Sequence, residues 1–555
     1  MLQDAREIST GTSLHFDICI VGAGAAGITL ANELAPHDKS IALLEAGGKR
    51  SHARTQSLYD GDVADPHRHG PLTRYRQRSL GGTTVVWGGR CAPFDDIDFQ
   101  HRSYVPHSGW PISRKELEPY YQRAHDYLEL GHFAYSTGGA CTQNLKQLIP
   151  GLQAPDVSDE FLWRFSPPTN FAKRYSAKLK AQPNLTLFLH ANCLKLVTNK
   201  EGNIVLYAET SSLLLNKFKV YARVFVLAAG GLEVTRLLLA SNEHHPNGIG
   251  NGHDLVGRFY LSHVAGSVGP VQLRSHRGEI THTYQKTSDN VYCRPALAIK
   301  EHAQRTHSLL NFRATLTHPP PEDPRHHSSV CSAMYLLKWC LSGRISPEFN
   351  RALANGQYRN ILLHSRNIIM DFPSLVSFAP VWIRKRLMCR RKLPSIEFKS
   401  RNNIYHLHYD SEQSPNYQSR VTLGDRKDSL GIRKLYVDWR FSSLDIDSTV
   451  RSISLLNAAF LKSGVGRLLR EQEDLTAMIS EQVHVGSHHL GLTRMGATPK
   501  QGVVDSNCKV FGTDNLYVAS SSVFPTSSFA NPTLTIVALA IRLGDFLRSL
   551  LGGKQ

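Results

Sequence analysis

The sequence of 555 residues lacks several features that would assign it to a special protein class. No stretch approaches the run of about 18 apolar residues that a membrane-spanning helix requires. Residues 1–14 contain no apolar block and include Asp4 and Glu7, so they do not resemble a secretory signal. The nine cysteines form no C-x-x-C pair and no metal-like spacing with histidine. These absences predict a cytoplasmic protein with reduced thiols and no metal site.

Acidic residues are few relative to basic ones. The chain has 64 Lys and Arg against 46 Asp and Glu, a formal net charge of +18 and a pI of about 9.5. Two basic clusters, 384–386 and 390–392, follow the apolar segment 375–383, which contains Trp382. This arrangement is typical of an interfacial membrane anchor, although a solvated helix face has the same composition. We keep peripheral membrane contact through 375–392 as a hypothesis, and we expect no nucleic-acid partner.

The remaining composition is that of a globular protein. The apolar fraction is 41% and the mean hydropathy is −0.27, so a mainly disordered chain is excluded. A chain of this length exceeds the size at which one hydrophobic core keeps growing, which predicts two domains. No internal repeat is visible, and repeat architectures are therefore set aside.

A dinucleotide-binding motif stands near the N-terminus. The apolar run 16–21 enters a G-x-G-x-x-G turn at 22–27, a helix-like stretch follows, and a second apolar run ends at Glu45. The glycines of such a turn let the backbone approach a pyrophosphate, which binds at the helix N-terminus. An acidic residue about 20 positions further on accepts hydrogen bonds from a ribose, which argues against NADP. The predicted binding residues are Gly22, Gly24, Ala25, Ala26, Gly27, Glu45 and Ala46.

Two further glycine-rich segments extend this site. Residues 81–90 place paired glycines on both sides of Trp87, which indicates backbone packed closely against something flat and large. Residues 220–227 form a buried type of strand that enters a small-residue turn at 228–231 and then a helix over 233–240. A second strand–glycine–helix turn indicates that the nucleotide domain resumes here, so we expect it to be discontinuous.

The middle of the chain has a different sequence pattern. Residues 185–196 and 204–209 alternate apolar with polar side chains, which predicts a small antiparallel element. From about 266 to 480, short alternating strands surround an irregular, basic, helix-prone insertion near 320–395. This mixture predicts an antiparallel sheet that carries helices and encloses a substrate pocket.

The C-terminal segment carries the candidate chemistry. Asn531 and Pro532 open an apolar helix, with Asn531 as its predicted cap, and the positive end of that helix suits a developing negative charge. His488 stands upstream in a glycine-rich turn, and histidine is the natural base for a hydroxyl proton near neutral pH. A structural or exposed histidine is the commoner occupant of such a turn, so the residues alone leave this role open.

The order of these motifs resembles the glucose-methanol-choline (GMC) oxidoreductases. The resemblance rests on the N-terminal G-x-G-x-x-G unit, on G-G-x-x-x-x-W-G-G at 81–89, on 227–238, on H-x-x-G-x-x-R-M-G at 488–496, and on the segment 515–533 with its V-F-P and N-P-T elements. The middle third of the chain resembles the family only in its general sequence pattern. The glycine cluster is most similar to that of sugar- and polyol-oxidising members such as pyranose oxidase, fructose dehydrogenase and glucoside 3-dehydrogenase.

The resemblance implies an α/β fold with two domains. One is a Rossmann-like FAD-binding domain that is discontinuous in sequence, and the other is an α+β substrate domain with an antiparallel sheet. We expect the FAD-binding domain at 14–100, 176–265 and 481–550. The substrate-binding domain is expected at 101–175 and 266–480.

The resemblance also implies residue roles. His488 is the expected general base and Asn531 positions the substrate hydroxyl, while His489 is the rival base because a one-residue shift of the alignment selects it. Non-covalent FAD is expected, since Val86 stands where some relatives carry a flavin-linked histidine. Ser520 stands where relatives often carry an aspartate that bonds to the flavin. The further cofactor-binding residues expected are Gly81, Gly82, Thr83, Trp87, Gly88, Gly89, Cys193, Ala229, Gly230, Ser520, Ser521, Asn531, Pro532 and Thr533.

The activity implied is oxidation of a CH–OH group to a carbonyl by hydride transfer to flavin N5. A sugar, a polyol or a sugar-bearing compound is the leading substrate class. One alternative is a hydrophobic or lipid-like alcohol at a membrane surface, and another is a flavin-binding or electron-transfer subunit with a vestigial pocket. The sequence does not distinguish oxygen, a quinone and a redox protein as electron acceptors.

Overall fold

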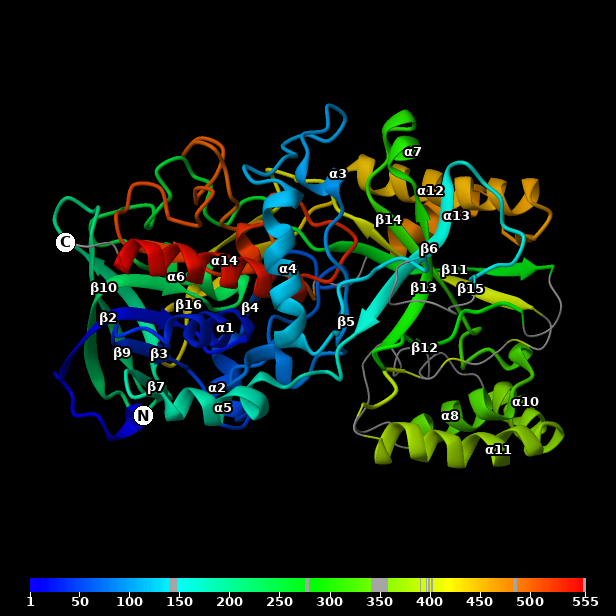
Figure 1. Cartoon of the computed structure of the whole chain (residues 1–555), viewed down its shortest axis with the longest axis horizontal. Helices are drawn as coiled ribbons and strands as arrows, with labels where there is room; N and C mark the ends of the chain where they lie inside the picture. Colours follow the sequence, from blue (N-terminus) through cyan, green and yellow to red (C-terminus); the bar gives the residue numbers. More distant parts are fainter. Residues whose placement is uncertain are drawn as a thin grey trace.

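The computed structural model contains two large β-sheets that follow one another along the long axis of the molecule (Figure 1). Each sheet is assembled from segments that are far apart in the chain. The structure describes residues 1–138, 147–274, 279–340, 358–389, 391–395, 397, 400, 403–470, 472–482 and 487–552.

The first sheet is mainly parallel. Its strand order is β1-β7-β3-β2-β10-β9-β8, and β19 pairs with the second half of β10. Among these strands the pairs β10–β9 and β9–β8 are antiparallel, and the other pairs are parallel. The strands are β1 (Leu2–Asp4), β2 (Ser13–Val21), β3 (Ile41–Leu44), β7 (Leu185–Leu189), β8 (Asn192–Thr198), β9 (Val205–Ser211), β10 (Lys217–Leu227) and β19 (Leu516–Val518).

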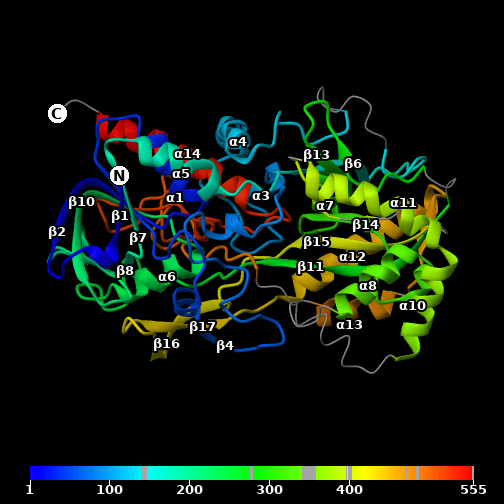
Figure 2. The same cartoon turned by 90° about the horizontal axis from the view of Figure 1, so that it is seen from below.

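Helices cover both faces of this sheet. Helix α1 (Ala25–Leu34) packs on β2 and β3 and against the C-terminal helix α14 (Thr533–Gly552), which also contacts α4 (Arg114–Leu128). Helix α5 (Phe171–Ala181) lies beside α1, whereas α6 (Gly231–Ala240) packs on β8. Figure 2 shows α5 and α14 on the side away from the small three-stranded sheet of β16 (Arg420–Lys427), β17 (Arg433–Asp438) and β4 (Gly61–Val63).

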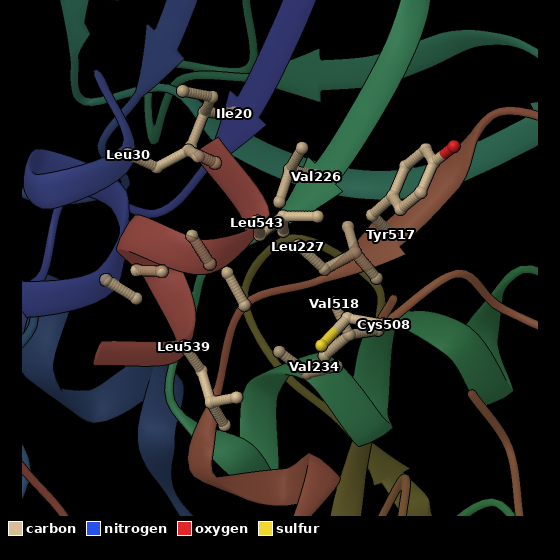
Figure 3. Close-up of a cluster of buried hydrophobic side chains, with 14 of the residues drawn as sticks. Ile20, Leu30, Val226, Leu227, Val234, Cys508, Tyr517, Val518, Leu539 and Leu543 are labelled. Carbon is tan, nitrogen blue, oxygen red and sulfur yellow. The ribbon is translucent and has the colours of Figure 1, made fainter. Parts of the chain in front are cut away.

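The core of this half lies between α14 and the central strands. Figure 3 shows Leu539 and Leu543 of α14 in a buried cluster with Ile20 of β2 and Val226 of β10. Both strand residues are fully buried, because the sheet is covered on its two faces. Such burial explains why β2, β3 and β10 appear in the sequence as nearly continuous apolar runs.

The second sheet is antiparallel. Its order is β18-β11-β15-β14-β13-β6-β5, with the short β12 on β13. Helix α12 (Ser443–Lys462) packs on β11, β15, β6 and β18. The strands are β5 (Arg90–Cys91), β6 (Val157–Phe165), β11 (His263–Leu273), β12 (Gln285–Lys286), β13 (Tyr292–Ile299), β14 (Phe312–Thr317), β15 (Ile404–Glu412) and β18 (Gly466–Leu468).

The other α-helices in the described part of the chain are α2 (Ala53–Gln56), α3 (Asp96–Phe99), α7 (Glu301–Thr306), α8 (Ser329–Cys340), α10 (Tyr358–Met370), α11 (Phe372–Ile383) and α13 (Gln472–Gln482).

Two local predictions differ from the structure. The segment 185–196 does not form one antiparallel element, because β7 joins the parallel sheet beside β3 while β8 pairs antiparallel with β9. Asn531 also precedes the C-terminal helix instead of capping it within the first turn. The first main-chain bond there runs from Ile536 N–H to the Pro532 carbonyl at 2.8 Å, and the Asn531 side chain is directed to other partners.

Candidate active site

A cavity of about 740 Å³ opens at the carboxyl ends of the central parallel strands, beside Val21 of β2 and Leu44 of β3. Open parallel sheets bind their ligands at this edge, and the volume lies in the usual range for small-molecule sites. The predicted cofactor-binding residues that line it are Gly22, Gly24, Ala25, Ala26, Glu45, Ala46, Gly82, Thr83, Trp87, Gly88, Gly89, Cys193, Ala229, Gly230, Ser520, Ser521, Asn531, Pro532 and Thr533.

Two predicted residues, Gly27 and Gly81, do not line the cavity but support its walls. A Cβ atom on Gly27 would lie 1.8 Å from the Gly22 carbonyl oxygen, so only glycine lets α1 pack on this turn. Gly81 has a φ of +91°, and a Cβ there would lie 2.9 Å from the Ala172 nitrogen. Both glycines therefore have a packing role beside the cavity.

Two glycines form a part of the cavity lining that carries no side chains, and we call this part the floor. Gly82 has a φ of +53°, and a Cβ on it would lie 3.0 Å from the Gly24 Cα. Gly24 is also the cap residue of α1, so the two glycines meet at the N-terminus of that helix. A floor without side chains beside a positive helix end is suited to the pyrophosphate of a dinucleotide.

Glu45 stands at the end of β3 with both carboxylate oxygens held by main-chain N–H groups. One oxygen accepts from Ala23 at 3.1 Å and the other from Gly47 at 2.7 Å. Burial raises the pKa of this carboxyl above its ordinary value, and the two hydrogen bonds oppose that rise. The residue is thus fixed at the cavity wall with acceptor capacity left for ribose hydroxyls.

A second wall comprises charged residues that the sequence did not single out. Glu233, in the first turn of α6, forms ion pairs with Arg76 at 3.1 Å and with Arg78 at 3.0 Å. Both guanidinium groups lie over the ring of Tyr59, at 4.0 and 4.9 Å from its centre. Although burial opposes the effect, Arg78 and Arg76 hold the pKa of Glu233 below its ordinary value. Arg78 Nε has no hydrogen-bond partner among the described residues.

The lining of the same cavity also includes His488 and Asn531. The Asn531 side-chain nitrogen lies 3.4 Å from His488 Nε2, and Arg90 Nε donates to Asn531 Oδ1 at 2.7 Å. The guanidinium of Arg90 also binds both Asp410 oxygens at 2.7 and 2.8 Å and lies over the Trp163 ring. Since Arg90 can only donate, it fixes the amide with its NH₂ group toward the histidine.

Both histidines in this region are buried and neutral at ordinary pH. His263 makes a perpendicular ring contact with His488 at 4.8 Å between centres and donates from Nδ1 to the Ser528 carbonyl. Burial lowers the pKa of His263 to about 4. Burial, His263 and Arg90 hold the pKa of His488 well below its ordinary value. His488 Nε2 thus accepts the amide hydrogen in this structure, and the same lone pair can take a proton when the amide donates to another acceptor.

The adjacent residues have different contacts. His489 lines the same cavity, but its ring stacks on Tyr260 at an interplanar angle of 9°, and its main-chain carbonyl accepts from Ser521 Oγ. Val86 faces the cavity with a side chain that has no nucleophilic atom. Ser520 Oγ accepts from the Ser522 main chain at 3.3 Å.

The residues missed by sequence reasoning come mainly from the second sheet. Arg90 begins β5, His263 begins β11, and Asp410 is near the end of β15. Each belongs to a different strand, so no periodic pattern in the sequence connects them. Only Arg90 had a usable signal, since it directly follows the glycine cluster.

Comparison with known proteins agrees with this arrangement. Residues 415–540 match the family model described as GMC oxidoreductase. The large subunit of fructose dehydrogenase from Gluconobacter japonicus is 24% identical over 96% of this chain and 98% of its own. The 2-methyl-1,2-propanediol dehydrogenase of Mycolicibacterium austroafricanum is 21% identical over 96% of this chain and 95% of its own.

Solved structures share the fold. A fungal aryl-alcohol oxidase superposes with a TM-score of 0.55 at 14% identity, covering 97% of this chain and 99% of that one. A formate oxidase of Aspergillus oryzae gives 0.54 at 16% identity, covering 98% and 99%. The predicted fold class, an α/β nucleotide-binding domain with an α+β partner, is confirmed.

Proposed function

Because this chain belongs to the GMC oxidoreductase family, we propose that it binds FAD non-covalently and oxidises a CH–OH group to a carbonyl. The cavity supports FAD through features of this structure: a floor without side chains at the N-terminus of α1, and the fixed carboxylate of Glu45. Two buried polar atoms of lining residues, Arg78 Nε and His488 Nδ1, have no partner among the described residues. When bound, FAD supplies the hydride acceptor.

The chain's own residues handle the hydroxyl group. The Asn531 amide donates to the substrate oxygen, and His488 Nε2 accepts the hydroxyl proton. The observation that carries this proposal is the pair itself: a neutral imidazole and an amide whose orientation is fixed by Arg90 adjoin one cavity. The proton leaves the oxygen as the carbonyl forms.

We propose a sugar, a polyol or a sugar-bearing compound as the substrate. The chain's relatives include a fructose dehydrogenase and a paromamine 6'-oxidase, so hydroxyl-rich compounds are represented among them. An anaerobic screen of sugars, polyols and apolar alcohols that follows flavin absorbance tests the substrate class. Reduction by hydroxyl-rich compounds supports the proposal, and reduction by apolar alcohols alone contradicts it.

A hydrophobic alcohol is the second candidate, because an exposed apolar surface is present on the helical insertion of the second sheet. A flavin-binding subunit with a vestigial pocket is the non-enzymatic alternative. The retained contact between His488 and Asn531 argues against it. Failure of every alcohol in the screen to reduce the flavin would favour that alternative. We also propose a cytoplasmic location, supported by the seven cysteines whose side chains the structure describes, all of which are free thiols.

Arg90 provides a test of how Asn531 is positioned. Replacing Arg90 by lysine keeps the charge but removes the planar group that binds Asp410 and Asn531 together. We expect the rate of flavin reduction to fall about tenfold, the value of one charge-assisted hydrogen bond. The effect should appear in the limiting rate more than in the apparent substrate affinity, because the amide orientation matters most during proton transfer.

The matched control is Arg123→Lys. Arg123 also binds a carboxylate through two guanidinium nitrogens, at Asp545, but it is not among the residues that line the cavity. Equal losses in the two variants would indicate a general structural effect and contradict the positioning role of Arg90. Anaerobic stopped-flow absorbance measures both.

A further inference from the structure

The helical insertion on the second sheet has an unusual distribution of polar groups. Helices α10 and α11 pack against α8 at one edge of the molecule (Figures 1 and 2). His364 hydrogen-bonds Ser332 Oγ at 3.0 Å, and Asn367 donates to the Pro324 carbonyl at 2.7 Å. Asp371 accepts from the Ser329 N–H group at 2.9 Å. These three polar side chains of the insertion are therefore turned inward and buried.

The outward surface of the same helices is apolar. Leu362, Ile369 and Met370 of α10 are 76, 75 and 74% exposed. On α11, exposed apolar residues recur at helical spacing. We call this surface the α10–α11 face, and it comprises Leu362, Ile369, Met370, Phe372, Val376, Val381 and Ile383. A helix that borders water normally has the opposite distribution, so this surface is suited to an apolar partner.

The charges around the α10–α11 face are of one sign. Residues 358–395 contain eight Arg and Lys but only one acidic residue, Asp371, which is 4% exposed and bonded to Ser329. Arg366, Arg384 and Lys385 are exposed. The partner that complements this surface is both apolar and anionic.

We propose that the α10–α11 face docks on an anionic lipid bilayer. Its apolar side chains enter the boundary between headgroups and acyl chains, and its cations contact the headgroups. Helix α11 has 12 residues, which is short for a span and typical of an interfacial segment. In the described part of the chain, no helix combines the length and apolar character needed to cross a bilayer.

A bilayer fits this surface better than a second copy of the chain does. A two-fold dimer would place the same cations of both copies against each other. The segment that follows α11 contacts the second sheet, since Arg391 donates to the Phe165 carbonyl at 3.2 Å and Phe165 pairs with Arg90. The docking inference does not depend on the proposed oxidation.

Vesicle co-sedimentation of the flavin-loaded full chain tests the apolar part. The vesicles contain equal parts of phosphatidylglycerol and phosphatidylcholine, and we expect the wild type to bind them. Val376→Glu/Ile383→Glu should bind at least about tenfold more weakly, because two charges replace apolar groups that the bilayer would bury. The matched control is Leu214→Glu/Leu215→Glu, at residues 64 and 59% exposed in the turn before β10. This control should bind as the wild type does.

The charge arm uses Arg384→Gln/Lys385→Gln. Each cation is expected to strengthen the affinity for anionic vesicles about fivefold, so the loss of two should weaken it about 30-fold. On vesicles of pure phosphatidylcholine, binding should be weak for every variant. The control with the same net charge is Lys178→Gln/Lys180→Gln on α5, at the other end of the molecule (Figure 1).

Three outcomes overturn the docking inference. In the first, the wild type does not bind the anionic vesicles. In the second, variants of the α10–α11 face bind as well as the wild type. In the third, no vesicle binding occurs, and light scattering shows a dimer that dissociates in Val376→Glu/Ile383→Glu. Flavin reduction by a soluble substrate is measured on the same samples and should be unchanged. Failure of the docking inference is thereby separated from failure of the proposed oxidation.

Discussion

Replacement of His488 by alanine is expected to slow anaerobic flavin reduction by about 10²- to 10⁴-fold, the usual contribution of a positioned general base. His488 Nε2 is the ring nitrogen that faces the Asn531 amide, and the variant leaves no group there to accept the hydroxyl proton. FAD content should remain close to that of the wild type, because the substitution leaves the glycine floor and the hydrogen bonds of Glu45 unchanged. Stopped-flow absorbance gives the rate, and the flavin-to-protein absorbance ratio gives the occupancy.

The control is the neighbouring substitution His489→Ala. Its ring stacks on Tyr260, so its removal costs packing but leaves the contact between His488 and Asn531 intact. We expect a reduction rate within a few-fold of the wild type. A larger loss in His489→Ala than in His488→Ala would transfer the base role to His489. An unchanged rate in His488→Ala would reject the proposed mechanism.

The pH dependence follows from the surroundings of His488. A base must be unprotonated, and burial, His263 and Arg90 hold the pKa of His488 well below 6.5. Protonation therefore begins only at more acidic pH than for a free histidine. The reduction rate should stay level as the pH falls through 6.5 and decline below it. A midpoint at or above 6.5 in the rate profile would contradict this electrostatic account.

The sequence predicted those parts of the site that local chemistry determines. The turn at Gly22 and Gly24, and the acidic residue Glu45, belong to one βαβ unit, so a short pattern specifies their geometry. The meeting of His488 with Asn531 was not visible in local pattern, and it was inferred from the family resemblance. The structure places both in the lining of one cavity, in contact with each other.

The parts that could not be predicted depend on long-range pairing. Arg90 reaches Asp410 across 320 positions, and the contact forms only because β5 and β15 belong to the same sheet. Strand β7 alternates like a half-buried antiparallel strand, yet β3 provides its neighbour and makes the pairing parallel. The apolar insertion was visible in the composition, but which of its faces meets water is decided by polar bonds such as that between Asn367 and Pro324.

The second large effect is expected at the cofactor floor, from Gly24→Val. In the structure, a Cβ on Gly24 meets nothing closer than 3.9 Å, and its φ of −88° suits any residue, so the protein should fold. The added side chain occupies the space that the glycine floor leaves for the pyrophosphate. We expect FAD binding to weaken by about 10- to 100-fold, which corresponds to an overpacking cost of about 1–3 kcal/mol. Titration of apoprotein with FAD, followed by flavin fluorescence, measures the change.

Gly252→Val is the matched control for Gly24→Val. Gly252 also has open space around its Cβ position, but it is an exposed loop residue outside the cavity. It should bind FAD like the wild type, and thermal unfolding of both apoproteins should coincide with that of the wild-type apoprotein. Gly27→Ala provides the contrasting case, because its Cβ would collide with the Gly22 carbonyl and destabilise the turn itself. If Gly24→Val bound FAD normally while remaining folded, the pyrophosphate would have to lie elsewhere, and the proposed role of the glycine floor would be wrong.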